Sequence, residues 1–243
     1  ATVSVEVKDV AGNSSTIPVN FTVDKVPPTV TVQPVNGSDI LNAADVLSGQ
    51  TVSVAASSDA SSVIVRINGT DYTAILTGGV WQATIPGSAL AALPNGASAF
   101  IVTATDTAGN ITSVSHTLTV DKVAPNVVID PVTRDNQVDI AELNSGINLT
   151  GKTVPADPGA LISVSINGHT LSGVVAADGS WSVPVSASDL AGMTNGTYTV
   201  TVIVTDTAGN ATLPQTATFN VNTNASAIAV SYTHLTLPTI CSV

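Results

Sequence analysis

The stretch Asp206-Thr-Ala-Gly-Asn210 decides the fold of this chain, because it occurs three times. Its earlier copies are Asp106-Thr-Ala-Gly-Asn110 and Asp9-Val-Ala-Gly-Asn13, at spacings of 100 and 97 residues. Each copy suits a turn, since Asp can accept backbone hydrogen bonds while Gly and Asn tolerate positive φ. A turn repeated at a period near 100 residues indicates tandem copies of one domain.

Other landmarks keep the same order and nearly the same period. They are Trp81 and Trp181, Ile67-Asn-Gly69 and Ile166-Asn-Gly168, Asn95-Gly96 and Asn195-Gly196, and Val23-Asp-Lys-Val-Pro27 and Val120-Asp-Lys-Val-Ala-Pro125. Together with the repeated turn these make five independent landmarks with one period, which do not arise by chance. A unit of about 100 residues matches an immunoglobulin-like β-sandwich.

The interior of the first full repeat favours the same fold. Short runs rich in Val, Ile and Thr are separated by clusters of Gly, Asn, Pro and Asp, as in all-β domains. In the run 98–105, Phe100, Val102 and Ala104 alternate with other residues, so one face can pack inward. The predicted strands are 29–34, 50–55, 62–67, 71–76, 80–85, 98–105 and 113–120. We expect single helical turns in the loops 88–93 and 187–193. The predicted fold class is all-β, with tandem immunoglobulin-like β-sandwich domains in an elongated rod.

The repeat also sets the expected domain boundaries. The expected segments are 1–24, the last two strands of a truncated repeat; 25–121 and 122–222, complete repeats; and 223–243, an atypical tail. Each linker is Asp-Lys followed closely by Pro, which restricts the backbone and predicts a stiff connection. The sequence begins inside a predicted strand, so we expect a fragment. The residues 231–243 have no counterpart in the repeats and resemble translated adapter sequence, so we expect them to be non-native.

Composition and charge exclude several classes of protein. Charged residues make up only 9%, and 6 Lys and Arg face 17 Asp and Glu, giving a net charge of −11. This balance argues against nucleic acid or an anionic membrane as the partner. No apolar run approaches the roughly 18 residues that span a bilayer, so no membrane insertion is expected. The single cysteine, Cys241, cannot form an intramolecular disulfide. No obligate oligomer is predicted.

Three motifs of the second full repeat together suggest a family. Gly179-Ser-Trp181, Asn195-Gly-Thr-Tyr-Thr-Val-Thr-Val202 and Asp206-Thr-Ala-Gly-Asn210 resemble the bacterial Ig-like repeats of giant non-fimbrial adhesins and biofilm-associated proteins. The resemblance covers residues 1 to about 222. It implies the stalk of an extracellular or cell-surface protein, commonly exported by a type I system and stiffened by calcium between domains. The implied partners are adjacent repeats and, through the parent adhesin, host surfaces or other bacterial cells.

Acidic residues recur at the predicted ends of the repeats. Antiparallel strands sort their loops onto two poles, so the turn of Asp106 and the linker of Asp24 should share one pole. The loop Asp39–Asp45 should lie at the other, and Asp139 and Glu142 correspond to its Asn42 and Asp45. Stacked repeats would bring such loops together. The predicted metal ligands are Asp24, Asp106, Asp39, Asn42, Asp45, Asp121, Asp206, Asp139 and Glu142, with Asp157 a further candidate.

Calcium is the expected ion for this set. Carboxylates packed closely repel one another unless a cation intervenes, and calcium takes about six to eight oxygen ligands with tolerant geometry. Soft-ligand metals are disfavoured, because no cysteine is at hand and the histidines are scattered. Two alternatives stay open at this point. Each Asp-x-Ala-Gly-Asn stretch can simply be a turn, and the linker Asp can pair with Lys25 or Lys122 in an exposed contact of little energetic value.

The sequence predicts a structural role and no enzyme. We find no unrepeated cluster of a nucleophile, a base and an acidic partner. Trp81 and Trp181 are predicted to be core residues, whereas His116, His169 and His234 share no repeat position and are predicted to be solvated or incidental. The leading hypothesis is a spacer that projects an adhesive tip. The alternative is that one repeat itself binds a glycan or protein, and the repeats differ most between Ser57–Ser61 and Thr153–Ala160.

Overall fold

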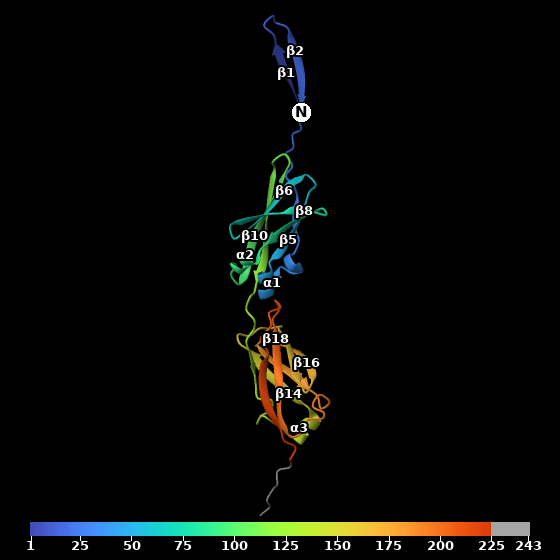
Figure 1. The fold of residues 1–243 in the computed structure, drawn as a ribbon, viewed down its shortest axis with the longest axis vertical. Helices are drawn as coiled ribbons and strands as arrows, with labels where there is room; N and C mark the ends of the chain where they lie inside the picture. Colours follow the sequence, from blue (N-terminus) through green and yellow to red (C-terminus); the bar gives the residue numbers. More distant parts are fainter. Residues whose placement is uncertain (225–243) are drawn as a thin grey trace, which may run out of the picture. The chain divides into compact units, whose positions relative to one another are not determined.

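The computed structural model describes residues 1–224, which form mostly short strands (Figure 1). Two compact units are present. The first contains Ala1–Ala124 together with the loop Thr205–Ala211, and the second contains Pro125–Val204 and the described residues from Thr212 onward. Of the predicted tail, only Thr223 and Asn224 are described, and the expectations for 231–243 lie outside the described residues.

The first unit begins with a hairpin that carries the first copy of the repeated turn. Strands β1 (Thr2–Lys8) and β2 (Ser14–Asn20) pair antiparallel across the turn at Asp9. Every residue of both strands is exposed. The hairpin therefore adds no buried core to the unit.

The rest of the first unit is a β-sandwich. Its elements are β3 (Val30–Val32), η1 (Val35–Gly37), β4 (Ile40–Leu41), α1 (Ala43–Ser48), β5 (Gln50–Ala56), β6 (Ala60–Ile67), β7 (Thr70–Thr73), β8 (Ile75–Thr77), β9 (Val80–Ile85), α2 (Gly87–Ala91), β10 (Gly96–Asp106) and β11 (Ile111–Val120). One sheet has the order β4-β11-β10-β6-β7 and the other the order β3-β5-β9-β8. Between them lies one core that includes Phe100, Val102 and Ala104, all at most 1% exposed. The prediction that this face of β10 packs inward is confirmed.

The predicted strand 71–76 is divided between the two sheets. β7 pairs with β6, whereas β8 pairs with β9. Ala74 separates them; it is 4% exposed and its N–H donates to the carbonyl of Val63 at 2.9 Å. The chain crosses from one sheet to the other at this buried residue. A run of alternating residues predicts strand in both halves but does not reveal such a crossing.

The second unit repeats the sandwich with small changes. Its elements are β12 (Val127–Ile129), β13 (Gln137–Val138), α3 (Ile140–Ser145), β14 (Ile147–Thr153), β15 (Leu161–Ile166), β16 (His169–Val174), β17 (Ser180–Val185), β18 (Gly196–Thr205) and β19 (Gln215–Val221). The sheet orders are β13-β19-β18-β15-β16 and β12-β14-β17. The prediction of all-β sandwiches is therefore confirmed. The described residues contain no helix long and apolar enough to cross a bilayer.

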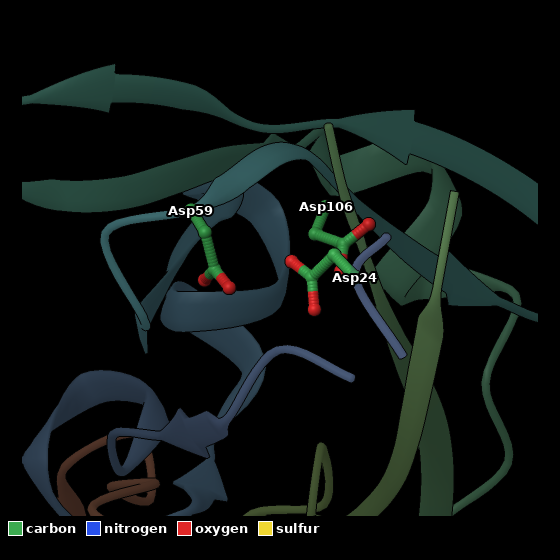
Figure 2. A group of neighbouring side chains, drawn as sticks. All are labelled: Asp24, Asp59 and Asp106. Atoms are coloured by element: carbon green, nitrogen blue, oxygen red, sulfur yellow. The ribbon is translucent and has the colours of Figure 1, made fainter. Parts of the chain in front are cut away.

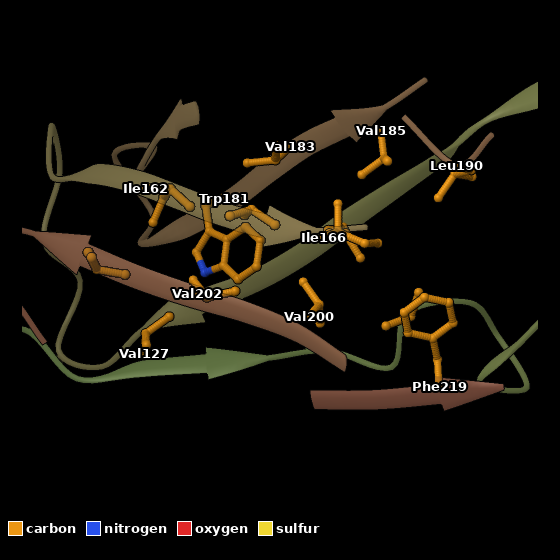
Figure 3. Packing of buried hydrophobic residues seen from close by; sticks show 14 of the residues in the cluster. Val127, Ile162, Ile166, Trp181, Val183, Val185, Leu190, Val200, Val202 and Phe219 are labelled. Carbon is orange, nitrogen blue, oxygen red and sulfur yellow. The ribbon is translucent and has the colours of Figure 1, made fainter. Parts of the chain in front are cut away.

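The two tryptophans differ because of the residues opposite them. Trp181 is 3% exposed and lies among Ile162, Val183 and Val202 in the second core (Figure 3). Its cross-strand partner is Gly151, which leaves room for the indole, although the indole N–H has no partner among the described residues. Trp81 faces the buried Val54 and is only partly buried, packed against the core. Both contact a core, as the sequence predicts.

The helical turns differ in part from expectation. The turn predicted at 88–93 is present as α2, but the segment 187–193 forms hydrogen-bonded turns and no helix. There the carboxylate of Asp189 accepts hydrogen bonds from the backbone N–H and the hydroxyl of Ser186. Because the N–H of Asp189 also donates to the hydroxyl of Ser186 at 3.3 Å, the two residues form a capping box. The N–H of Leu190 donates to the carbonyl of Ser186 at 3.3 Å, so one turn forms but does not continue as a helix. The short helices α1 and α3 are not predicted by the sequence, because neither is long enough to show helical periodicity.

Candidate metal centre

Three carboxylates meet at one end of the first sandwich. Asp24 comes from the segment before β3, Asp59 from the turn between β5 and β6, and Asp106 from the last residue of β10. One ligand oxygen from each lies within 4.8 Å of the others. Figure 2 shows the side chains converging from these separate segments. Asp106 is buried, Asp59 half-buried and Asp24 exposed.

The repeated turn fixes Asp106. One carboxylate oxygen accepts the N–H groups of Ala108 and Asn110, both at 2.8 Å, and the other accepts the side-chain amide of Asn110 at 2.8 Å. Gly109 supplies the left-handed backbone that the turn needs, at φ +90°. The side-chain amide of Asn110 is the main cause that lowers the pKa of Asp106, and backbone N–H groups lower it further. The carboxylate therefore stays ionised although water has little access to it.

Asp24 and Asp59 are each held by one local hydrogen bond. Oδ1 of Asp24 accepts the N–H of Val26 at 3.0 Å, and the carbonyl of Asp24 accepts the side chain of Asn110 at 3.3 Å. Oδ1 of Asp59 accepts the hydroxyl of Ser57. Each carboxylate thus keeps a second oxygen outside these bonds. Asn110 links the linker to the turn, so the two predicted ligands Asp24 and Asp106 are held together.

The chemistry of this cluster fits calcium. Its ligands are all oxygen, the ligand type that calcium prefers. Among the described residues, no Lys, Arg or His forms an ion pair with any of the three carboxylates. Three like charges at this separation repel one another, and a divalent cation would remove that repulsion. The residues that would hold the ion are Asp24, Asp59 and Asp106.

The predicted ligands of the other loop have local structural partners. Asp39 accepts the N–H of Val35 at 2.7 Å and pairs with Nε2 of His116 at 2.8 Å. The prediction that His116 is solvated or incidental is therefore wrong, because this pair lies partly buried at the edge of the sheet. Asn42 caps α1: its Oδ1 accepts the N–H of Asp45, whose carboxylate accepts the N–H of Asn42. These groups form a capping box, which stabilises the start of a short helix.

The corresponding loop of the second unit is built in the same way. Asp139 accepts the N–H groups of Ala141 and Glu142, both at 2.8 Å, and Glu142 accepts the N–H of Asp139. Both carboxylates line an open cavity together with Asp135 and Asn222. Within the described residues they belong to no group of three closely spaced ligand atoms like that of the first unit.

Asp121 and Asp206 repeat the linker and turn arrangement. Asp206 is 8% exposed and accepts the backbone and side-chain N–H groups of Asn210 at 2.7 and 2.8 Å. The carbonyl of Asp121 accepts the side chain of Asn210 at 3.1 Å, as that of Asp24 accepts Asn110.

Asp59 is the residue that sequence reasoning missed. It lies in the turn between the second and third predicted strands, at the pole where the Asp106 turn was expected. Asp157 lies in the equivalent turn of the second unit and was a candidate, with its N–H donating to Thr153 Oγ1 at 3.0 Å. Comparing the two repeats at this turn would have drawn attention to Asp59.

Comparisons with known proteins found similar solved structures. Two of the most similar solved structures are a Ca²⁺-stabilised adhesin that helps an Antarctic bacterium reach out and bind ice, and a 1.5-MDa bacterial ice-binding adhesin studied for host cell surface retention. They are 30% and 31% identical to this chain over 90% and 91% of its length, each with a TM-score of 0.48. The chain covers 56% and 74% of those two structures. Among curated proteins, no sequence matches.

The family itself is shown by a sequence model. The model for the bacterial Ig-like domain matches residues 48–122 and 135–223, which together make up more than half of the chain. Both matches fall on the two sandwiches described above. The chain therefore belongs to the family of bacterial Ig-like domains.

Proposed function

We propose that these domains are spacer repeats in the stalk of a bacterial surface or secreted adhesin that acts in cell adhesion or biofilm formation. The two sandwiches have the same design, and each contains the same turn and follows the same Asp-Lys linker. This repetition supports a role that is repeated once per domain. In this proposal the repeats are 25–121 and 122–222, their direct partners are adjacent repeats, and the parent adhesin reaches host surfaces or other bacterial cells. The location is extracellular or at the cell surface.

A structural role also explains the polar residues that recur. The recurring acidic residues lie in turns, at helix caps and in the carboxylate cluster. Which of these roles an acidic residue has is set by its position in the repeat. We therefore propose no catalytic activity for this chain.

Calcium is the proposed stiffening ion, and the cluster of Asp24, Asp59 and Asp106 is the observation that carries this proposal. The ion would connect the segment before β3 to two turns of the sandwich that follows. Such a bridge would restrict the linker at Asp24. A chain of repeats stiffened at each linker would hold its tip away from the cell.

Calorimetric titration of the full chain with calcium tests the site. We expect Asp59→Asn to weaken calcium binding at least about tenfold, because it removes one charged ligand from a small set. Asp71→Asn is the matched control; Asp71 pairs with Arg66 on an exposed sheet face and should not change the affinity. An unchanged affinity in Asp59→Asn, or no binding by the wild-type chain, would contradict the proposed site.

Small-angle scattering tests the stiffening separately. We expect chelation to give a shorter and more variable envelope for the full chain, and millimolar calcium to restore an extended one. Asp59→Asn should remove the part of this difference that comes from the linker at Asp24, and Asp121→Ala the part that comes from the linker at Asp121. Calcium binding without any change in the envelope would mean that the ion does not stiffen the chain.

A further inference from the structure

The three copies of the repeated turn differ in how deeply their last residue is buried. Asn13 is exposed, Asn110 half-buried and Asn210 only 7% exposed. All three make the same bonds to the Asp that opens the turn. The difference must therefore come from what covers each turn. The loop Thr205–Ala211 is part of the first compact unit, where it lies against the start of α1.

Asn210 uses its whole side-chain amide in this contact. Its Oδ1 accepts the N–H of Ala43 at 2.9 Å, and its Nδ2 donates to the carbonyl of Asp121 at 3.1 Å and to Asp206 at 2.8 Å. The N–H of Ala43 is the first of α1, and such groups have no acceptor within their own helix. The side chain of Asn210 thus satisfies a backbone group that a short helix leaves open.

Asn42 completes the contact from the other side. While its Oδ1 caps α1, its Nδ2 donates to the carbonyl of Ala208 at 3.2 Å. Gly209 passes so close that an added Cβ would lie 3.0 Å from this nitrogen, whereas a Cβ at Gly109 would meet nothing within 4 Å. The loop is therefore fitted to Asn42 in shape as well as in hydrogen bonding.

The second unit shows which part of this contact is specific. Its helix α3 is capped by Asp139, and a carboxylate accepts hydrogen bonds but has none to donate to a loop carbonyl. The first residue of α3, Ile140, has no side-chain acceptor for its N–H among the described residues. An Asn cap can therefore donate a hydrogen bond to a carbonyl of the turn, whereas an ionised Asp cap cannot.

We propose that Asn42, Ala43 and the carbonyl of Asp121 form a docking surface for an Asp-x-Ala-Gly-Asn turn, and that Asn42 selects this partner. The contact consists of direct hydrogen bonds between neutral groups, together with the intraturn bond to Asp206. It therefore needs no cation. Chelation separates this inference from the proposed calcium site, because only the latter depends on an ion.

Amide hydrogen exchange of the full chain in EDTA, followed residue by residue by NMR, tests the docking surface. After correction for intrinsic rates, we expect the amide of Ala43 to exchange at least about tenfold more slowly than that of Ile140. Asn210→Ala should raise the rate at Ala43 by about tenfold. The amide of Val46, which donates to Asn42 within α1 at 3.0 Å, should keep its rate and so report that the helix remains folded.

Two further variants complete the test. Asn42→Asp keeps the helix cap but loses the donor to Ala208, so it should also accelerate exchange at Ala43. Asn110→Ala makes the same change as Asn210→Ala in the equivalent turn and should leave Ala43 unaffected. The proposal is overturned if Ala43 exchanges as fast as Ile140, if EDTA alone removes its protection, or if Asn110→Ala accelerates it as much as Asn210→Ala.

Discussion

Gly151→Ala tests how the second core accommodates its tryptophan. A Cβ at this position would overlap the backbone carbonyl of Val128 and the indole ring of Trp181, both well inside van der Waals contact. Gly151 lies in β14, between β12 and β17, so neither neighbour is free to move away alone. Both overlaps must be relieved, so the β12–β14 pairing must open and the indole must shift within the core.

The two adjustments add their costs. Opening the short β12 ladder loses about two hydrogen bonds, about 2 kcal/mol, and loosens the packing of Val127 by about 1 kcal/mol. Shifting the indole adds to this, up to about 4–6 kcal/mol if its roughly 150–250 Å² of apolar surface were fully exposed. Because Ala is favoured over Gly in a strand by about 0.5–1 kcal/mol, we expect a net loss of at least about 2 kcal/mol.

Urea unfolding followed by tryptophan fluorescence in a Trp81→Phe background measures this loss for the second unit. Gly173→Ala is the control, since its Cβ would come closest to the Val183 side chain, at 2.8 Å, and would stay 3.4 Å from the nearest backbone atom, the carbonyl oxygen of Ser182. We expect it to cost less than about 1 kcal/mol. The reasoning is refuted if Gly151→Ala changes the unfolding free energy by less than about 0.5 kcal/mol, or if both variants lose the same amount.

Three other predictions follow from single contacts. His116→Ala should destabilise the first unit by about 1–2 kcal/mol, because partly buried Asp39 loses a donor. Adding Asp39→Asn should recover part of this loss, since the second unit has Asn136 and Ala217 at the positions of Asp39 and His116, and Nδ2 of Asn136 donates to the carbonyl of Thr218 at 2.7 Å. No recovery in the double variant, measured by thermal unfolding, would contradict this. The pKa of Asp106 is lowered in the folded state, so its ionised carboxylate stabilises the fold fully above the ordinary pKa of 3.8, and this stabilisation is lost as pH falls through the lowered pKa. Without calcium, the difference in Tm between wild type and Asp106→Asn should therefore be larger at about pH 5 than at about pH 2.5. A difference in Tm that does not change with pH would contradict this reasoning. Trp181→Phe should stay within about 1 kcal/mol of wild type in urea unfolding, because removing an unpaired buried N–H offsets the lost packing; a loss above about 3 kcal/mol would show that the N–H carries no penalty.

The limits of sequence reasoning are clearest at the acidic loops. Asn42, Asp45, Asp139 and Glu142 have the residue types of calcium ligands, and they also have the spacing of capping boxes. Composition alone does not choose between these uses. The structure employs them as caps, because each lies three residues from a backbone N–H that a short helix exposes. Their use as metal ligands stays a prediction.

The sequence by itself determined the sandwich fold, the family and the turn that holds Asp106. These depend on local and periodic features: alternation along a strand, a turn whose bonds span five residues, and a repeat of about 100 residues. These features involve residues close together in the sequence or a regular repeat, so they can be recognised in a single sequence.

Only the tertiary structure decided which polar groups meet. Asp59 joins Asp24 and Asp106 because two turns and a linker reach the same end of one sandwich. Asn210 is buried, and Asn110 is not to the same degree, because the start of α1 covers one turn alone. These contacts join residues tens to more than a hundred positions apart. Their geometry depends on how sheets pack and loops close, which hydrophobic periodicity does not encode.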